Sequence, residues 1–238
     1  MIAVIIPVLN EEKSIGLVAR DLLTTAKLEK LKLQIIVCDN GSTDNTAAVA
    51  KAASCLVVNE PVRGYGAACL RALQAMPAAA EIVLFIDGDY SDFPEEFPAL
   101  VRPILENRAD LVVGSRTLPG AVRERGALTP QQRFGNWLAT FLIRVFFGQR
   151  YSDLGPFRAI SRAALQKLNM QDRNFGWTVE MQIRAARQKL RAIEVPVSYR
   201  KRIGVSKISG TIKGTVMAGY IILKTIFKEF LRKGLRDC

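Results

Sequence analysis

Continuous apolar runs at regular intervals constrain the fold of this chain more than any other feature of the sequence. The runs do not alternate with polar residues, which is typical of β-strands covered on both faces. The segments between them carry helix start signals, such as Pro94 followed by two glutamates. Repeated strand and helix units of this length predict an α/β fold with a mainly parallel, doubly wound sheet and helices on both faces. The predicted strands are residues 2–6, 33–37, 56–58, 82–86 and 111–113, and the predicted helices are residues 12–27, 43–53, 66–76 and 94–106.

Composition narrows the chemistry that the chain can perform. The 238 residues suffice for one large domain or two small ones with a sizeable core. The absence of histidine excludes a zinc site of mixed histidine and cysteine ligands, and any reaction that needs a histidine base. The four cysteines show no metal-binding spacing, and no leader-like segment follows Met1, so a reduced, cytoplasmic compartment is expected.

Positive charge is concentrated near the C-terminus. Residues 184–238 hold 14 lysines and arginines against three acidic residues, so they carry about +11 of the formal net charge of +12. An anionic partner should therefore meet the C-terminal third of the chain. Nucleic acid is not the expected partner, because the basic segment lacks the interleaved aromatic residues of a stacking platform.

Acidic residues follow three of the predicted strands at the point where each strand ends. Glu11 follows the first strand, Asp39 the second, and Asp87 and Asp89 flank Gly88 after the fourth. The carboxyl ends of parallel strands meet at one edge of a sheet, where ligands bind. Converging carboxylates repel one another unless a cation or a donor-rich ligand lies among them.

This acidic edge predicts a metal and diphosphate site. Mg²⁺ usually takes one or two protein carboxylates and fills its shell with phosphate oxygens and water. A glycine between two aspartates leaves room for a diphosphate to approach the backbone. The alternative for Asp87 and Asp89 is a polar turn, and the alternative for the nearby acids Asp44 and Asp92 is helix capping.

Five segments, in this order, resemble the signature of the family 2 inverting glycosyltransferases. They read "AVIIPVLNEE", "IIVCDNGSTDNT", "NEPVRGYGAA", "VLFIDGDYSDFPE" and "DLVVGSR". The resemblance is to the branch of dolichyl-phosphate mannose synthases and polyprenyl-phosphate glucosyltransferases, and it covers residues 1–210. It implies a GT-A fold that binds a nucleotide-diphospho-sugar with Mg²⁺ or Mn²⁺. Residues 1–116 would then form the nucleotide-sugar half, residues 117–210 the acceptor half, and residues 211–238 a basic amphipathic C-terminal helix.

The resemblance also implies roles for individual residues. Asp87 and Asp89 would hold the metal, with Asp89 the more direct ligand and a catalytic residue. Arg116 would lie near the sugar or the acceptor phosphate and is also expected to be catalytic. A further set of residues would bind the nucleotide-sugar. For Pro7 and Asn10, its first two members, plain turn formation is the alternative. That set comprises Pro7, Asn10, Glu11, Asp39, Gly64, Gly66, Asp87 and Gly88.

The acceptor decides whether the reaction needs a base. The oxygen of an acceptor phosphate is already anionic and needs none, whereas a hydroxyl acceptor needs a carboxylate base, for which Asp153 and Glu180 are the candidates. The alternative for Glu180 is a surface residue favoured by the helix dipole. A cluster of basic residues is suited to bind a phosphate group. The alternative is that these residues only form a solvent-exposed basic face. The expected phosphate ligands are Arg116, Arg158, Arg200, Arg202, Ser206 and Lys207.

Two apolar segments with basic residues, 134–148 and 214–234, favour helices that lie at a membrane surface. Neither is an uninterrupted apolar run long enough to span a bilayer. The alternative is a core helix for the first segment and a dimer helix for the second. We expect a peripheral protein on the cytoplasmic face of a membrane, with homo-oligomer formation left open.

These features together predict an inverting transfer of a hexose, from UDP-glucose or GDP-mannose, to a polyprenyl or dolichyl phosphate. Transfer to a hydroxyl of a glycolipid or glycan is the alternative. Two more distant alternatives are a nucleic-acid-binding protein, because the calculated pI is 9.8, and an NAD-dependent dehydrogenase, because "GYGAAC" is one residue short of a dinucleotide-binding glycine motif. Cys69 stands where that motif has its third glycine.

Overall fold

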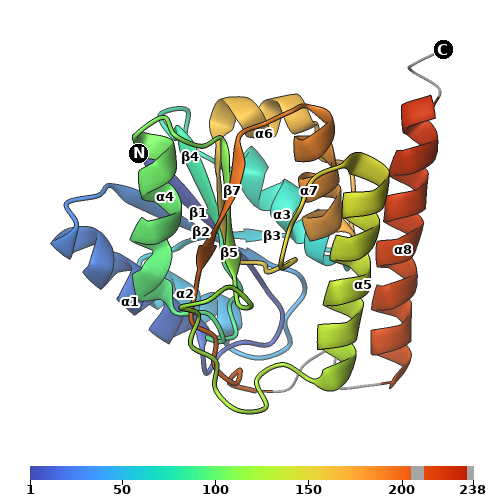
Figure 1. Ribbon diagram of the computed structural model, residues 1–238. Coiled ribbons are helices and arrows are strands. Elements are labelled where there is room, and N and C mark those ends of the chain that lie inside the picture. The colour runs from blue at the N-terminus through green and yellow to red at the C-terminus, as the bar shows by residue number, and fades with distance from the viewer. Residues whose placement is uncertain (205–211, 235–238) are drawn as a thin grey trace.

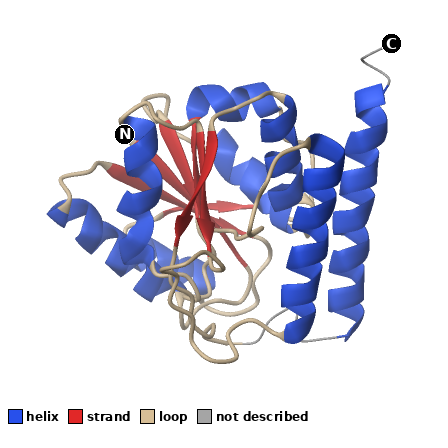
Figure 2. Cartoon of the chain, viewed as in Figure 1, coloured by secondary structure: helices blue, strands red, loops and turns tan. Residues whose placement is uncertain are grey.

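The computed structural model describes residues 1–204 and 212–234, with side chains over 1–204 and 217–231. Its centre is a seven-stranded sheet with helices packed on both faces (Figures 1 and 2). The strand order is β3-β2-β1-β4-β6-β5-β7. The strands are β1 (Ile2–Val8), β2 (Leu33–Asp39), β3 (Leu56–Asn59), β4 (Ile82–Phe85), β5 (Leu111–Ser115), β6 (Arg158–Ser161) and β7 (Ala192–Pro196).

The helices form two layers over this sheet. Buried side chains of α1, α2 and α4 share one core with the sheet, and those of α3, α5, α6, α7 and α8 share the other. The predicted α/β fold with helices on both faces is therefore confirmed. The helices are α1 (Ile15–Leu28), α2 (Thr46–Ala52), α3 (Tyr65–Gln74), α4 (Phe97–Leu105, after a short 3₁₀ turn at Pro94–Glu96), α5 (Pro130–Phe147), α6 (Arg162–Leu168), α7 (Trp177–Arg187) and α8 (Ile212–Gly234).

The continuous apolar runs are explained by the two cores. Along β1, Ala3 and Ile5 point into one core while Ile2, Val4 and Ile6 point into the other. Because successive side chains of a strand alternate between faces, a strand covered on both sides needs apolar residues at every position. Burying each such isoleucine stabilises the fold by about 1.5–3 kcal/mol.

Strand β6 is the one departure from a parallel arrangement in the described sheet. It runs antiparallel to both of its neighbours, β4 and β5. It comes from the segment 117–210, so both halves of the chain contribute to one sheet. Strands β1, β2, β3, β4 and β5 still run in the same direction, and their carboxyl ends lie at one edge.

Helices α5 and α8 stand side by side at one end of the molecule (Figure 1). Aromatic side chains join them, with the ring centroids of Phe146 and Phe230 4.6 Å apart. Helix α5 starts with a reciprocal pair of hydrogen bonds between Thr129 and Gln132 and ends at Gly148, whose φ is +74°. Across residues 1–204 and 212–234, no helix is both long enough and apolar enough to cross a bilayer.

Candidate active site

A cavity of about 230 Å³ lies where the strand ends meet, and we call it the strand-end cavity. Residues that follow β1, β2 and β4 line it, together with the start of α3. Two residues from the second half of the chain, Phe175 and Arg202, complete the lining. The other lining residues are Pro7, Val8, Leu9, Glu11, Asn40, Arg63, Gly64, Tyr65, Ala68, Asp87, Gly88 and Asp89.

Asp87 and Asp89 lie at the end of β4 and face different partners. The hydroxyl of Tyr65 donates to Asp87 over 3.0 Å, and Ser91 donates its backbone N–H to Asp89 over 2.9 Å. The guanidinium of Arg202 lies 3.2 Å from the second oxygen of Asp89. Burial and the neighbouring carboxylate of Asp89 raise the pKa of Asp87 to about 7.

This pair of carboxylates fits a Mg²⁺ or Mn²⁺ ion that shares its ligands with a phosphate. In the described part of the chain, no group of three or more histidine, cysteine or acidic side chains is arranged to hold a metal by itself. Two hard oxygen ligands beside an open cavity are the protein contribution that Mg²⁺ commonly uses. Burial and then the charge of Asp89 raise the pKa of Asp87, and a bound cation would offset both effects.

Glu11 and Arg202 form an ion pair within the strand-end cavity. The backbone N–H of Glu11 is fixed by the Thr46 hydroxyl at 2.8 Å, and the Ser14 hydroxyl donates to its carboxylate. Arg202 therefore forms ion pairs with two acids. One is Glu11, which follows β1, and the other is Asp89, which follows β4. Of the expected phosphate ligands, Arg202 is the one that lines this cavity, while Ser206 and Lys207 lie outside the described residues.

Asn10 and Asp39 tie the neighbouring turns together. Asn10 has a φ of +54° and accepts the N–H of Thr43 over 2.8 Å, while its own N–H donates to Ser42. Asp39 accepts the N–H of Ser42 over 2.8 Å. These contacts match the turn-forming alternative for Asn10.

Asn40 is a cavity residue that the sequence did not single out. Its side-chain amide donates to the carbonyls of Glu60 and Val62 and accepts the N–H of Gly64, each over 2.8 Å. It thereby holds the loop before α3 against the end of β2. Its position directly after Asp39, at the end of a predicted strand, is the sequence feature that could have identified it as a cavity residue.

The glycines have packing roles within the protein. A Cβ on Gly64 would overlap the carbonyl oxygen of Arg173, and one on Gly66 would overlap that of Asp172. A Cβ on Gly88 would lie 2.6 Å from Val8. We expected these glycines to let a nucleotide approach the backbone; the structure instead brings other protein segments against them, although Gly64 and Gly88 also line the cavity.

The start of α3 also argues against the dehydrogenase alternative. Gly66 donates its N–H to Asn174 over 3.2 Å, and Ala67 donates to Arg173 over 2.9 Å. A dinucleotide site of that class needs such N–H groups for the pyrophosphate. Here protein carbonyls occupy them.

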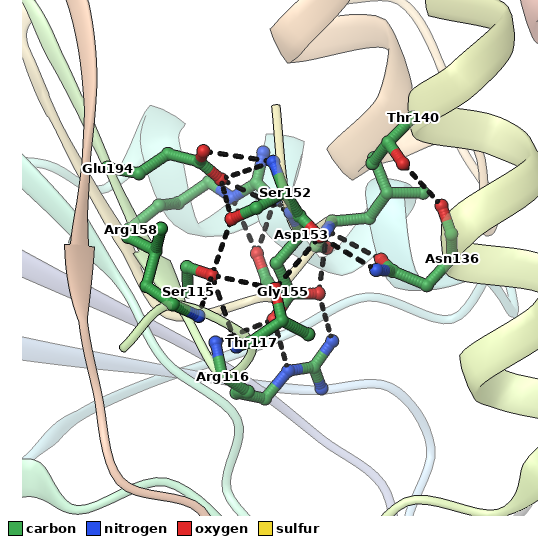
Figure 3. A network of polar contacts seen from close by, with 12 residues as sticks. Ser115, Arg116, Thr117, Asn136, Thr140, Ser152, Asp153, Gly155, Arg158 and Glu194 are labelled. Carbon is green, nitrogen blue, oxygen red and sulfur yellow. Dashed lines mark hydrogen bonds and ion pairs between the residues drawn. The ribbon is translucent and has the colours of Figure 1, made fainter. Parts of the chain in front are cut away.

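Arg116 and Asp153 form a buried, two-pronged ion pair beside the end of β5 (Figure 3). The guanidinium donates to both carboxylate oxygens over 2.7 Å, and the Arg116 N–H donates over 2.8 Å. Burial opposes the charge on Asp153, but Arg116 holds the pKa of that carboxyl below its usual value. Asp153 is therefore a weak base with both oxygens engaged, and it positions Arg116 under the ring of Tyr199.

Two other expected phosphate ligands are built into the protein. Arg158 is 0% exposed and donates to the carbonyls of Leu154, Gly155 and Thr178, which leaves it no route to a phosphate. Burial lowers its pKa to about 10. Arg200 lies between the rings of Tyr90 and Phe93, 3.7 and 4.0 Å from their centroids. We expected both to contact the acceptor; the fold uses them to support loops.

Glu180 is neither at the surface nor in contact with the strand-end cavity. It is 3% exposed, and its carboxylate accepts the N–H groups of Gln171 and Asp172. Arg184, one turn later on α7, pairs with it at 2.7 Å. These contacts give Glu180 an anchoring role in place of the expected role as a base.

Asp92 is buried, and its side chain has no hydrogen-bond partner among the described residues. It is 1% exposed, and neither carboxylate oxygen accepts a hydrogen bond from the described residues. It does not cap a helix, so the capping alternative is wrong for this residue. Burial, and then the charge of Asp87, raise its pKa well above the usual value.

An arginine-lined cavity of about 390 Å³ is formed by the loop that connects β5 to α5, together with Arg133 of α5. Its charged lining is Arg123, Glu124, Arg125 and Arg133, and Glu124 also pairs with Lys201 at 3.6 Å. Sequence reasoning missed these arginines because they lie in a loop without a recognised spacing. The signal was their position shortly after Arg116.

Comparison with known proteins supports one family. The sequence profile of "Glycosyl transferase family 2" matches residues 3–168. An uncharacterized glycosyltransferase of Mycobacterium bovis is 34% identical over 218 residues, covering 91% of this chain and 94% of the relative. A dolichyl-phosphate hexose transferase of Haloferax volcanii is 28% identical over 234 residues, covering 97% and 96%.

A solved structure extends the likeness to the fold. Glucosyl-3-phosphoglycerate synthase of Mycobacterium tuberculosis, in complex with Mn²⁺, UDP and glucosyl-3-phosphoglycerate, aligns with a TM-score of 0.74 at 26% identity, covering 96% of this chain and 79% of that protein. The same enzyme was also crystallised with Mg²⁺ and UDP. The acidic strand ends, the sheet and the profile agree, and the chain belongs to the family 2 glycosyltransferases.

Proposed function

We propose that the chain transfers a hexose from a nucleotide-diphospho-sugar to a polyprenyl phosphate at a membrane surface, with Mg²⁺ or Mn²⁺. The observation that carries this proposal is the strand-end cavity, where Glu11, Asp87 and Asp89 line one space. The crystallised relative binds UDP with Mn²⁺ or Mg²⁺, and the Haloferax relative is a dolichyl-phosphate hexose transferase, which supports the donor and the acceptor respectively.

Each residue has a defined task in this proposal. Asp87 and Asp89 hold the metal, which when bound neutralises charge on the departing nucleoside diphosphate. Glu11 and Pro7 face the nucleoside. Arg116, fixed by Asp153, presents positive charge at the end of β5, and the arginine-lined cavity adds positive charge in the loop that leads to α5.

A phosphate acceptor, which needs no base, is consistent with the contacts that the two candidate bases Asp153 and Glu180 already make. Its oxygen attacks the anomeric carbon without losing a proton, so no base is required. Both candidate bases are engaged: Asp153 by Arg116, and Glu180 by Arg184 and two backbone N–H groups. A hydroxyl acceptor would need one of these partnerships to break.

Exposed aromatic side chains on α5 support action at a membrane surface. Phe134 and Trp137 are 62% and 58% exposed, and with Phe141 they form a row whose ring centroids are 5.9 and 5.8 Å apart. Within α5 the only charged residues are Arg133 and Arg144. An aromatic row flanked by cations is suited to the interface of an anionic lipid layer, whereas a second copy of the same face would bring like charges together.

Radiolabelled sugar transfer tests the proposal. Undecaprenyl phosphate is incubated with UDP-glucose or GDP-mannose and either Mn²⁺ or EDTA, using wild type, Asp89→Ala and the exposed control Glu106→Ala. We expect chloroform-soluble label from one donor that requires the metal and is lost only in Asp89→Ala. Metal-dependent donor hydrolysis without labelled lipid would contradict the acceptor, and no consumption of either donor would contradict both donor candidates.

A further inference from the structure

The segment 171–176 contributes one residue to the lining of the strand-end cavity, although it lies far from the strand ends in sequence. Phe175 lines the cavity directly. The carbonyls of Arg173 and Asn174 accept the first N–H groups of α3, from Ala67 and Gly66. The glycines at 64 and 66 are required by this close approach, since any side chain there would overlap the segment. The position of segment 171–176 therefore fixes both the place of Phe175 and the start of α3.

Glu180 anchors this segment by accepting hydrogen bonds from its backbone. Its carboxylate accepts the N–H of Gln171 at 3.0 Å and that of Asp172 at 2.8 Å. Two hydrogen bonds to a charged, buried acceptor are stronger than ordinary backbone contacts. The segment is thus clamped between a carboxylate of α7 and the N–H groups of α3.

Glu180 is connected in turn to α8. Arg184 lies 2.7 Å from Glu180 and 3.0 Å from Glu229, and Arg187 lies 2.8 Å from the other oxygen of Glu229. All four side chains are largely buried, and Glu229 is 2% exposed. At the end of the segment, a Cβ on Gly176 would overlap the hydroxyl of Thr225 on α8. Removing one charge from such a buried network leaves its partners uncompensated, which strongly destabilises the arrangement.

We propose that Glu180 and Glu229 are positioning residues of the strand-end cavity, which hold segment 171–176 against α3 and so keep Phe175 in place. Neither residue lines the cavity, and Glu229 belongs to α8. Their effect on donor binding rests on the proposed function. Their effect on the segment does not.

Amide hydrogen exchange and nucleotide binding test this proposal in the full chain. The variants are Glu180→Gln and Glu229→Gln, with Glu229→Asp as the variant that retains the charge. The control is Glu29→Gln, which breaks the exposed pair with Arg102. In ligand-free protein we expect exchange at the amides of Gly66, Ala67, Gln171 and Asp172 to rise by about fivefold or more in the glutamine variants. With Mn²⁺ present, the Kd of UDP or GDP, whichever the wild type binds, should rise by about fivefold while kcat at saturating donor stays within about twofold.

The possible outcomes separate this proposal from a general loss of stability. Recovery in Glu229→Asp and wild-type behaviour in Glu29→Gln would support it. Unchanged exchange at the four amides would overturn it, and so would a rise in exchange spread evenly over all helices. A local rise in exchange with unchanged nucleotide Kd and donor KM would also overturn it, because the network would then be structural only. If wild type binds neither UDP nor GDP, the proposed function fails, and the exchange of the four amides alone decides whether the two glutamates hold the segment.

Discussion

The hydroxyl of Tyr65 donates a hydrogen bond to the carboxylate of Asp87 over 3.0 Å. This contact joins the first turn of α3 to the end of β4. It favours the charged form of Asp87, whereas burial and Asp89 disfavour that form and raise the pKa to about 7. The neutral residue Tyr65 therefore helps to keep Asp87 charged.

Replacing Tyr65 with Phe should weaken binding of Mn²⁺ in a pH-dependent way. Loss of a hydrogen bond to a carboxylate costs its charged form about 1.5 kcal/mol, which raises its affinity for a proton by about tenfold. The pKa of Asp87 rises further, so protons compete more strongly with the metal. We expect a large difference from wild type at pH 6.5 and a small one at pH 8.5 in Mn²⁺ titration calorimetry. An equal effect at both pH values would show that Tyr65 acts through packing.

Replacing Asp92 with Asn should stabilise the protein at neutral pH. The folded pKa of Asp92 lies above its unfolded value, so its contribution to stability is fully present below pH 4 and is lost as pH rises through the folded pKa. The amide removes a buried carboxylate that costs about 1–3 kcal/mol. Thermal unfolding at pH 7.5 should show a higher Tm than wild type, with little gain at pH 4.

Asp110→Asn is the matched control for this change. Arg191 lowers the pKa of Asp110, so that carboxylate contributes stability at neutral pH and its loss should lower Tm. If Asp92→Asn also lowered Tm at pH 7.5, Asp92 would have a stabilising partner in solution.

Replacing Asp153 with Asn should destabilise the fold, whatever its effect on transfer. The change leaves Arg116 buried with a neutral partner, which costs about 3–5 kcal/mol. Urea unfolding measures the loss. The double variant Arg116→Met, Asp153→Asn should recover much of the stability because no unpaired charge remains, yet it should stay inactive. Full activity in Asp153→Asn would contradict the positioning of Arg116 by Asp153.

Replacing Trp137 with Ser should weaken binding to anionic lipid vesicles by about tenfold, because a large exposed aromatic surface is lost from α5. Co-sedimentation with phosphatidylglycerol and phosphatidylcholine vesicles measures the effect and its dependence on charge. Leu28→Ser removes a similarly exposed apolar side chain from the end of α1 and should leave binding unchanged. Equal loss in both variants would argue against α5 as the membrane-binding face.

Periodicity predicted most of the sheet but not its order. Strands β1 to β5 fall on the predicted runs, because burial on both faces demands apolar residues at every position. A short strand and helix were expected after the apolar helix at 134–148, but β6 has only four residues and begins with the buried Arg158, so it lacks a continuous apolar run. Its antiparallel place between β4 and β5 depends on contacts distant in sequence.

Strand topology likewise predicted three of the acids that meet, whereas the fourth, Asp39, holds a turn and does not line the cavity. Glu11, Asp87 and Asp89 line one cavity because they follow parallel strands that end at the same edge. The arginines were harder to place. Arg158 and Arg200 look like phosphate ligands in sequence, yet carbonyls and aromatic rings contributed by other segments hold them. Such partners exist only once the chain has folded.

Phe175 closes the strand-end cavity from the second half of the chain, and its segment is anchored through α7 to Glu229. During synthesis, every carboxylate of the cavity leaves the ribosome before either of these parts exists. The nascent chain can form the first strands early, but under the proposed positioning by Glu229 the cavity is complete only after α8 has emerged and docked. A ligand that needs the finished cavity is therefore expected to bind only after the segments up to α8 have been synthesised.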